Sequence, residues 1–179
     1  MVEKENNRKE NPMRSIMIEK VVLHVGTGKE VRDLERGEKL LSKFTSQKIT
    51  KTLAKKRIPT WGIRPGLPIG VRVTLRGKDA EEILERLLKA RDNKLKESCF
   101  DDYGNINFGI EEYIEIPGLK YDPEIEIMGL QVSIALRRRG QRVQHRKVKR
   151  SKIGKNHKVS RQEAIEYMKN KYGVIVEVE

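Results

Sequence analysis

The chain has 179 residues, of which 39 are Lys or Arg and 26 are Asp or Glu, so its formal net charge is +13. This positive excess favours a polyanionic partner, and the length suits one compact domain. Cys99 is the only cysteine and no apolar run approaches the roughly 18 residues that span a bilayer, which excludes an intrachain disulfide and a membrane-spanning helix and fits an intracellular setting.

The charge is divided unevenly along the chain. Residues 43–76 contain nine basic and no acidic residues, and residues 137–158 contain eleven basic and no acidic residues. Between them, residues 97–126 contain nine acidic residues and a single lysine. A charge run is often just a solvated face, but like charges at this density repel one another unless a polyanion neutralises them.

The first predicted element is a strand over residues 15–25. Its alternation places Met17 and Val21 on one face and Lys20 and His24 on the other. An amphipathic helix over residues 31–46 follows, and then a short strand over residues 48–53.

Residues 58–70 hold three prolines and three glycines, which predicts a long exposed loop. The clearest strand follows at residues 71–76, where Arg72, Thr74 and Arg76 alternate with apolar side chains.

Asp79, with Glu82 three residues later, predicts the N-cap of the next helix. A turn at residues 103–105 precedes a strand over 106–110, and a longer strand over 125–137 is interrupted by Gly129.

A second capping box, formed by Ser160 and Glu163, predicts a helix that ends near Tyr172 with Gly173 as its terminator, before a final strand over residues 174–178.

These elements predict an α+β fold with a mostly antiparallel sheet, helices packed on one face and the other face open for RNA. Residues 1–12 are charged and polar, lack the apolar core of a secretory signal and predict a flexible N-terminal tail. Residues 13–179 are expected to form a single domain whose basic C-terminal extension begins at about residue 137.

Enzymatic signatures are weak. The segment from Gly26 to Lys29 resembles a phosphate loop, but Leu23 stands at the required earlier glycine and Glu30 at the required Ser or Thr. The single cysteine and three histidines lack zinc-ligand spacing, and no catalytic triad can be nominated. We therefore expect no catalytic residue, metal, cofactor or small-molecule substrate.

The alternation of Arg72, Thr74 and Arg76 indicates an RNA-binding strand. Successive outward side chains lie roughly 6.5–7 Å apart, close to the phosphate spacing along one RNA strand, although an ordinary solvent face would show the same pattern. The acid-free loop beside it holds Trp61, the only tryptophan. That side chain either packs into the protein and anchors the loop, or belongs to a protruding loop that contacts a second RNA.

Several motifs together resemble the universal 5S-rRNA-binding protein family of the large ribosomal subunit, number five in the bacterial series. They are Asn11-Pro12-Met13-Arg14, Ile18-Glu19-Lys20-Val21-Val22, Gly62-Ile63-Arg64 with Gly70, Val73-Thr74-Leu75-Arg76-Gly77 and Gly104-Asn105-Ile106-Asn107-Phe108-Gly109. The segment from Lys152 to Tyr172 resembles the archaeal and eukaryotic branch of that family.

The resemblance implies a structural protein of the cytoplasmic ribosome that attaches 5S rRNA in the central protuberance. It implies further contacts with large-subunit rRNA, P-site tRNA and neighbouring proteins, including a small-subunit head protein in an intersubunit bridge, for which residues 97–126 are a candidate. It assigns 5S rRNA binding to His24, Gln47, Thr74 and Arg76, although bacterial members usually carry Asn where this chain has His24.

From the charge pattern and the resemblance together we expect three groups of contacts. The expected rRNA-binding residues are Arg14, Lys20, His24, Gln47, Lys48, Lys51, Arg72, Thr74 and Arg76. The expected tRNA-contacting loop residues are Lys55, Lys56, Arg57, Trp61 and Arg64. The expected RNA contacts of the basic extension are Arg137, Arg138, Arg139, Arg142, Arg146, Lys147, Lys149, Arg150 and Lys152. The alternatives are a subunit of an RNA-modification enzyme and a general RNA chaperone.

Overall fold

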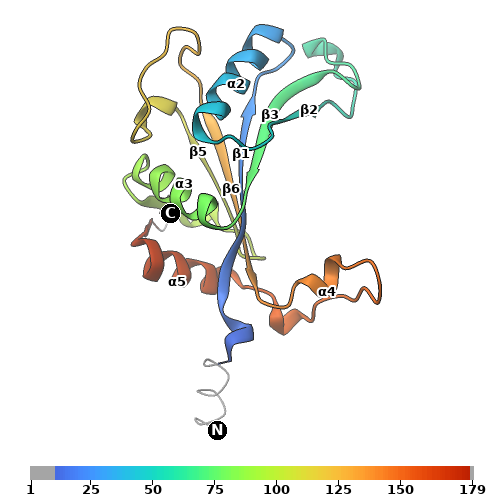
Figure 1. Cartoon of the computed structure of the whole chain (residues 1–179), viewed down its shortest axis with the longest axis vertical. Coiled ribbons are helices and arrows are strands. Elements are labelled where there is room, and N and C mark those ends of the chain that lie inside the picture. The colour runs from blue at the N-terminus through green and yellow to red at the C-terminus, as the bar shows by residue number, and fades with distance from the viewer. Residues whose placement is uncertain (1–10, 178–179) are drawn as a thin grey trace.

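The computed structural model describes residues 11–177, and within that range the chain forms a five-stranded antiparallel sheet and a two-stranded parallel sheet (Figure 1). The strands are β1 (Ile16–Gly26), β2 (Thr50–Leu53), β3 (Pro68–Leu75), β4 (Lys94–Lys96), β5 (Asn105–Ile110), β6 (Leu130–Arg138) and β7 (Ile175–Glu177). The α-helices are α2 (Val31–Phe44), α3 (Lys78–Lys89), α4 (Arg142–His145) and α5 (Arg161–Tyr172). Short 3-10 turns are η1 (Pro12–Arg14), η2 (Pro59–Trp61), η3 (Glu97–Cys99), η4 (Tyr113–Glu115) and η5 (Lys155–His157).

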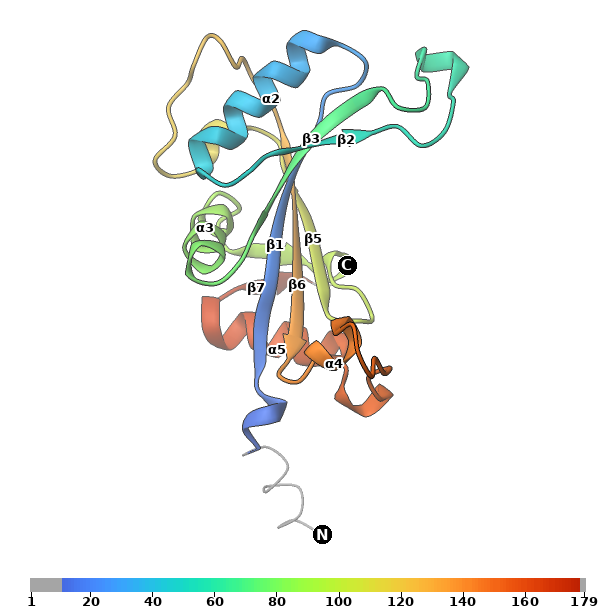
Figure 2. The same ribbon diagram turned by 45° about the vertical axis from the view of Figure 1, so that its right-hand side comes forward.

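The larger sheet has the strand order β2-β3-β1-β6-β5, and α2 and α3 lie on one side of it in both views (Figures 1 and 2). The core fills the space between these helices and the sheet, with Leu23, Leu41 and Leu84 fully buried. Gly37 allows α2 to approach β3 closely, because a Cβ there would lie 2.9 Å from the Val71 side chain. The predicted α+β fold with a mostly antiparallel sheet is therefore confirmed.

A bulge at Glu19 corrects the predicted faces of the first strand. Ile18 pairs with Leu136 and Lys20 pairs with Ala135, so Glu19 is an extra residue in β1. Since side chains alternate with a period of two, one extra residue reverses the faces of the preceding segment. Ile18 packs against the core, and the prediction that Met17 shares the face of the later core residues is wrong.

The two predicted capping boxes have different outcomes. The α5 box is confirmed, because the Ser160 side chain accepts from the Glu163 amide while the Glu163 side chain accepts from the Ser160 amide. The N-cap predicted at Asp79 is wrong, because α3 begins one residue after Gly77. Gly77 adopts φ 66° and ψ −141°, a positive-φ conformation that a glycine tolerates, and this places Asp79 inside the first helical turn.

One strand prediction needs correction, and one short strand was not predicted. The strand expected from residue 125 begins at Leu130, because residues 121–129 leave the sheet as a loop. Gly129 marks the junction, where a Cβ would lie 2.9 Å from the Glu111 carbonyl oxygen. The short strand β4 was not predicted, and it pairs in parallel with β7.

The C-terminal segment packs onto the core. Val159, Ala164, Met168 and Val174 are each 4% exposed or less. The predicted final helix and strand are present as α5 and β7. The predicted N-terminal tail lies outside the described residues up to residue 10, and its last residues enter η1, where Asn11 Oδ1 accepts from the Met13 amide at 2.9 Å.

Candidate nucleic-acid interface

The sheet face opposite α2 and α3, here called the open face, brings together polar side chains from all five strands. It comprises Thr50 and Thr52 of β2, Arg72 and Thr74 of β3, Lys20, Val22 and His24 of β1, Gln131, Ser133, Ala135 and Arg137 of β6, and Asn105, Asn107 and Gly109 of β5. The pairing register aligns one complete row across the sheet, from Thr50 through Arg72, His24 and Gln131 to Gly109.

The chemistry of the open face suits an RNA backbone. None of its fourteen residues is acidic, and they supply ammonium, guanidinium, imidazole, hydroxyl and amide groups. Arginine and lysine bind phosphates, while hydroxyls and amides reach phosphates, 2′-OH groups and base edges. Adjacent strands lie about 4.8 Å apart, so these groups form a regular two-dimensional array.

Most of these side chains are not engaged by the fold. Within residues 11–177, the side chains of Lys20, Arg72, Thr74 and Asn107 have no polar partner. His24 donates from Nδ1 to Gln131 Oε1 at 3.4 Å, a long bond that leaves the Gln131 amide nitrogen available. Asn105 is also engaged, since its Nδ2 donates to Asp101 Oδ2 at 3.2 Å, but the other groups named here are donors and acceptors that the fold does not use.

Arg76 lies just beyond the end of β3, at the border of the open face. Its Nη1 donates to the Glu19 carbonyl oxygen at 3.3 Å and lies 3.8 Å from the Glu19 carboxylate. The bulge in β1 thus places one acid beside this arginine, while the Arg76 side chain stays 59% exposed. The contact is weak enough to exchange for a phosphate.

The structure separates several residues that were predicted to act together. Lys51 lies on the helix side of β2, where its Nζ is 2.8 Å from Glu38 Oε1. Gln47 precedes β2, and its Nε2 donates to Asp79 Oδ2 at 3.0 Å. Lys48 is exposed beside Gln47, outside the sheet.

Arg14 lies in η1, before β1 begins. Of the nine predicted rRNA-binding residues, the open face and its border hold Lys20, His24, Arg72, Thr74 and Arg76.

Apart from Arg137, the open-face residues of β2, β5 and β6 were not among the predicted RNA contacts. The alternation of Gln131 and Ser133 with buried Val132 and Ile134 was a usable signal for a polar face. That alternation could not give the strand register, which sets Gln131 beside His24.

The segment that joins β2 to β3 forms a basic arm, residues 54–67, which projects beyond the sheet (Figure 2). Paired amide bonds hold its base, with the Ala54 amide donating to the Leu67 carbonyl at 2.8 Å. The predicted loop is shorter than expected, because β3 already begins at Pro68.

Within this arm the buried anchor is Ile63, whereas Trp61 is 65% exposed. Trp61 therefore does not anchor the loop by packing into the protein. The four basic residues of the arm are exposed and have no polar side-chain partner in the described part of the chain: Lys55, Lys56, Arg57 and Arg64.

A second basic arm, residues 139–152, includes α4 and lies on the opposite side of the molecule from α5 in Figure 1. Its tip is shaped by a bond from Arg146 Nε to the Lys149 carbonyl at 2.7 Å. Its predicted RNA-contact residues are exposed: Arg139, Arg142, Arg146, Lys147, Lys149, Arg150 and Lys152.

Arg137 and Arg138 belong to β6 and point to opposite faces of it. Arg138 is 7% exposed, pairs with Glu163 and donates to the Asn156 carbonyl at 3.5 Å. It joins β6 to α5 and is not available to a phosphate, whereas Arg137 lies on the open face.

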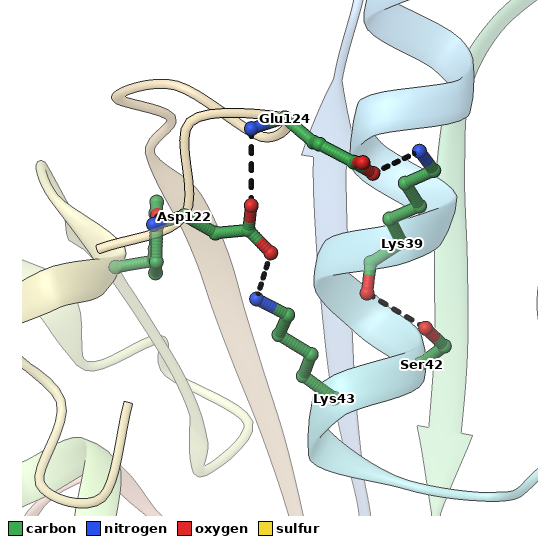
Figure 3. Close-up of polar contacts among 6 residues, drawn as sticks. Lys39, Ser42, Lys43, Asp122 and Glu124 are labelled. Carbon is green, nitrogen blue, oxygen red and sulfur yellow. Dashed lines mark hydrogen bonds and ion pairs between the residues drawn. The ribbon is translucent and has the colours of Figure 1, made fainter. Parts of the chain in front are cut away.

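Ion pairs join the acidic loop after η4, residues 122–126, to α2 on the helix side of the sheet, and Figure 3 shows two of them. Arg36 pairs with Glu126 at 2.5 Å. Figure 3 shows a second pair, which joins Lys39 to Glu124 at 2.6 Å. The hydrogen bond with Glu124 raises the pKa of Lys39 above its ordinary value.

A third pair joins Lys43 to Asp122 at 2.5 Å, and this hydrogen bond lowers the pKa of the Asp122 carboxyl. These three pairs offset positive charge on α2, whereas most of the cations on the open face and the two arms have no acidic partner among residues 11–177.

No helix in residues 11–177 is both long and apolar enough to cross a membrane. Across the same residues, the His, Cys, Asp and Glu side chains form no cluster of three or more that would hold a metal ion.

Comparison with known proteins agrees with this arrangement. Residues 11–64 match the family model described as Ribosomal protein L5, and residues 68–167 match the model of the C-terminus of the same ribosomal protein family. The large ribosomal subunit protein uL5 of Nanoarchaeum equitans is 51% identical over 166 residues, which cover 92% of this chain and 98% of that protein. The proteins of the same name from Sulfurisphaera tokodaii and Methanococcoides burtonii are 46% and 41% identical over 167 residues, which cover 93% of this chain and 94% and 99% of those proteins.

The fold, the acid-free face and these matches define a structural, non-enzymatic constituent of the large ribosomal subunit. The chain belongs to the ribosomal protein L5 family. The resemblance drawn from the sequence motifs is therefore confirmed, and the relatives named above are archaeal, in agreement with the branch indicated by the C-terminal motifs.

Proposed function

We propose that the open face binds 5S rRNA and attaches it to the large subunit in the central protuberance. The observation that carries this proposal is the absence of acidic side chains from the fourteen residues of the open face, while on the helix side three cations of α2 pair with acids of residues 122–126. A face built for solvent alone has no physical reason to separate charge in this way.

Recognition by this face combines phosphate neutralisation with shape. Lys20 and Arg72 bind phosphates, and Thr74 and Ser133 offer hydroxyls to 2′-OH groups, so the backbone geometry of the RNA is read more than its base sequence. His24 lacks the paired donor and acceptor of an amide. The Gln131 amide beside it accepts from His24 through Oε1 and offers its Nε2 donor at the same place on the face.

A filter-binding titration with 5S rRNA across a range of salt concentrations tests this proposal. We expect affinity to fall steeply with salt and to exceed the affinity for unrelated RNAs in competition. Binding that is undetectable or insensitive to salt contradicts the proposal, and equal affinity for unrelated RNAs favours a general RNA chaperone. The double variant Thr74→Ala/Arg76→Ala should weaken 5S binding while circular dichroism shows an intact fold.

We infer that the arm formed by residues 54–67 contacts P-site tRNA. Its support is the combination of exposed Trp61, four unpaired cations and a rigid base that projects from the sheet. In reconstituted ribosomes, Arg57→Gln with Arg64→Gln should weaken tRNA binding at the P site and leave 5S rRNA incorporation unchanged. Unaltered tRNA binding in that variant removes the arm from the tRNA contact.

We also infer that the remaining acids around η4 face a basic protein neighbour, such as a small-subunit head protein in an intersubunit bridge. Glu111, Glu112 and Glu115 are exposed, and their carboxylates have no partner among residues 11–177. Glu112→Lys with Glu115→Lys should slow subunit association, measured by light scattering. Glu82→Lys with Glu85→Lys, on exposed positions of α3, is the control for the change in net charge.

A further inference from the structure

A pocket of about 240 Å³ opens where the open face meets the segment from the second arm to η5. The groups that matter in its wall are Tyr103, Asn105, Arg137, Gln141, Gln144 and Lys158. Sites for drug-sized ligands measure roughly 300–1,000 Å³, so the volume of this pocket suits a smaller group. Asn105 and Arg137 belong to both the pocket lining and the open face, so an RNA bound to the open face would lie next to the pocket.

One wall is an exposed aromatic ring in a fixed position. Tyr103 is 63% exposed, and Lys158 Nζ lies 5.0 Å from the centre of its ring. The turn that carries Tyr103 is closed by the Asp101 amide, which donates to the Asn105 carbonyl at 2.8 Å. Gly104, at φ +74°, seats this turn against Val159, where a Cβ would lie only 2.8 Å away.

Other groups of the lining are polar and have no hydrogen-bond partner among the described residues. The side-chain amides of Gln141 and Gln144 have no hydrogen-bond partner in the described part of the chain. Arg137 Nε is buried and also has no partner there. Since nearly all buried donors in native proteins are satisfied, an unsatisfied one beside a pocket points to a ligand with an acceptor.

The second arm holds this polar lining in place. The His157 ring donates from Nε2 to the Arg139 carbonyl at 2.7 Å, and the Arg138 guanidinium joins Glu163 of α5 to the Asn156 carbonyl. These contacts hold the base of the second arm, which carries Gln141 and Gln144.

We propose that this pocket receives one unpaired nucleobase of the bound RNA. The base takes the place of the Lys158 ammonium over the Tyr103 ring, and its edge meets the amides of Gln141 and Gln144. The displaced Lys158 side chain binds a flanking phosphate. Proteins recognise unpaired RNA bases in this way, by aromatic stacking together with hydrogen bonds to the base edge. The proposal rests on the proposed function, because it assumes that the open face presents the RNA.

Chemical probing of the 5S rRNA complex with base-specific reagents tests the proposal, together with affinity measurements on three variants. In the wild-type complex, one unpaired nucleotide should be protected at its base edge. Tyr103→Ala should lower affinity by roughly 5- to 150-fold and expose that nucleotide alone. Tyr103→Phe should keep the protection, because it keeps the ring. Tyr121→Ala removes a tyrosine that is 57% exposed on the acidic loop and should match wild type.

Gln144→Ala provides a second test at an exposed position. It should weaken protection of the same nucleotide without altering the others. If Tyr103→Ala and Gln144→Ala leave affinity and every protection unchanged while the wild type binds 5S rRNA, the pocket holds no base and the open-face proposal stands. If the wild type does not prefer 5S rRNA over unrelated RNA, the proposed function fails, and this inference fails with it.

Discussion

Arg72→Gln separates binding by the open face from binding by bulk charge. Arg72 lies on β3, between Thr50 and His24 in the row that crosses that face, and its guanidinium has no partner among the described residues. Its replacement should therefore change the free energy of unfolding by no more than about 0.5 kcal/mol. A charge-assisted hydrogen bond to phosphate contributes about 1.5–3 kcal/mol, so affinity for 5S rRNA should fall roughly 10- to 150-fold.

Arg32→Gln is the matched control. Arg32 is exposed on α2, on the helix side of the sheet, and its loss changes the net charge by the same amount. Its charge acts on the RNA only through a potential that salt screens over about 8 Å at 0.15 M, so we expect nearly wild-type affinity.

Filter binding at several salt concentrations gives both the affinity and its salt dependence. For Arg72→Gln, the slope of log K against log salt concentration should fall in magnitude by about 0.7–0.9, the value for one lost phosphate contact. Equal losses of affinity in Arg72→Gln and Arg32→Gln would refute the assignment of the open face, because they would show that only total charge matters.

Three further predictions concern the fold that supports these sites. Gly104→Ala combines a left-handed φ with crowding, and should cost about 1–3 kcal/mol and lower Tm by about 2–12 °C. Gly66→Ala, at φ +85° with nothing within 4 Å of the new Cβ, should lower Tm less, and an equal drop would exclude crowding as a cause. Met168→Ala should lower the free energy of unfolding by about 2–5 kcal/mol and Tm by about 4–20 °C, because Met168 is fully buried. Lys169→Ala, at an exposed position, should change Tm little. Similar thermal unfolding of the two variants would show that α5 is not part of the core. The pKa of the Asp122 carboxyl is lowered from its ordinary value of 3.8, so the ion pair with α2 stabilises the fold above pH 3.8 and this contribution is lost as the pH falls through the lowered pKa. An NMR titration of the Asp122 carboxyl with a midpoint at or above pH 3.8 would contradict the ion pair.

Local patterns predicted the elements that depend on local physics. The alternation through Arg72 and Thr74 placed β3 and its outward face correctly, because side chains on a strand alternate whatever the strand's neighbours are. The Ser160 and Glu163 capping box predicted the start of α5, because its bonds form within one helical turn. By contrast, Asp79 lost its expected N-cap role to Gly77, whose backbone conformation sharply redirects the chain between β3 and α3.

Predictions that needed long-range pairing were less accurate. The basic run was expected to supply RNA contacts throughout, but Arg138 points into the core and pairs with Glu163, while Arg137 faces outward. Lys51 lies on the helix side of β2 and pairs with Glu38. Neither outcome can be read from composition, since it depends on which partner the fold brings near each charge.

The sequence by itself determined the excess of positive charge, its separation into two acid-free segments and the periodicity of the main strands and helices. These properties depend on residue counts and on neighbours a few positions away. Only the tertiary structure decided which side chains share the open face, because that depends on the register of five strands and on the bulge at Glu19. It also decided that residues 122–126 neutralise α2 and that the second arm forms a pocket with Tyr103, since both arrangements join segments far apart in the chain.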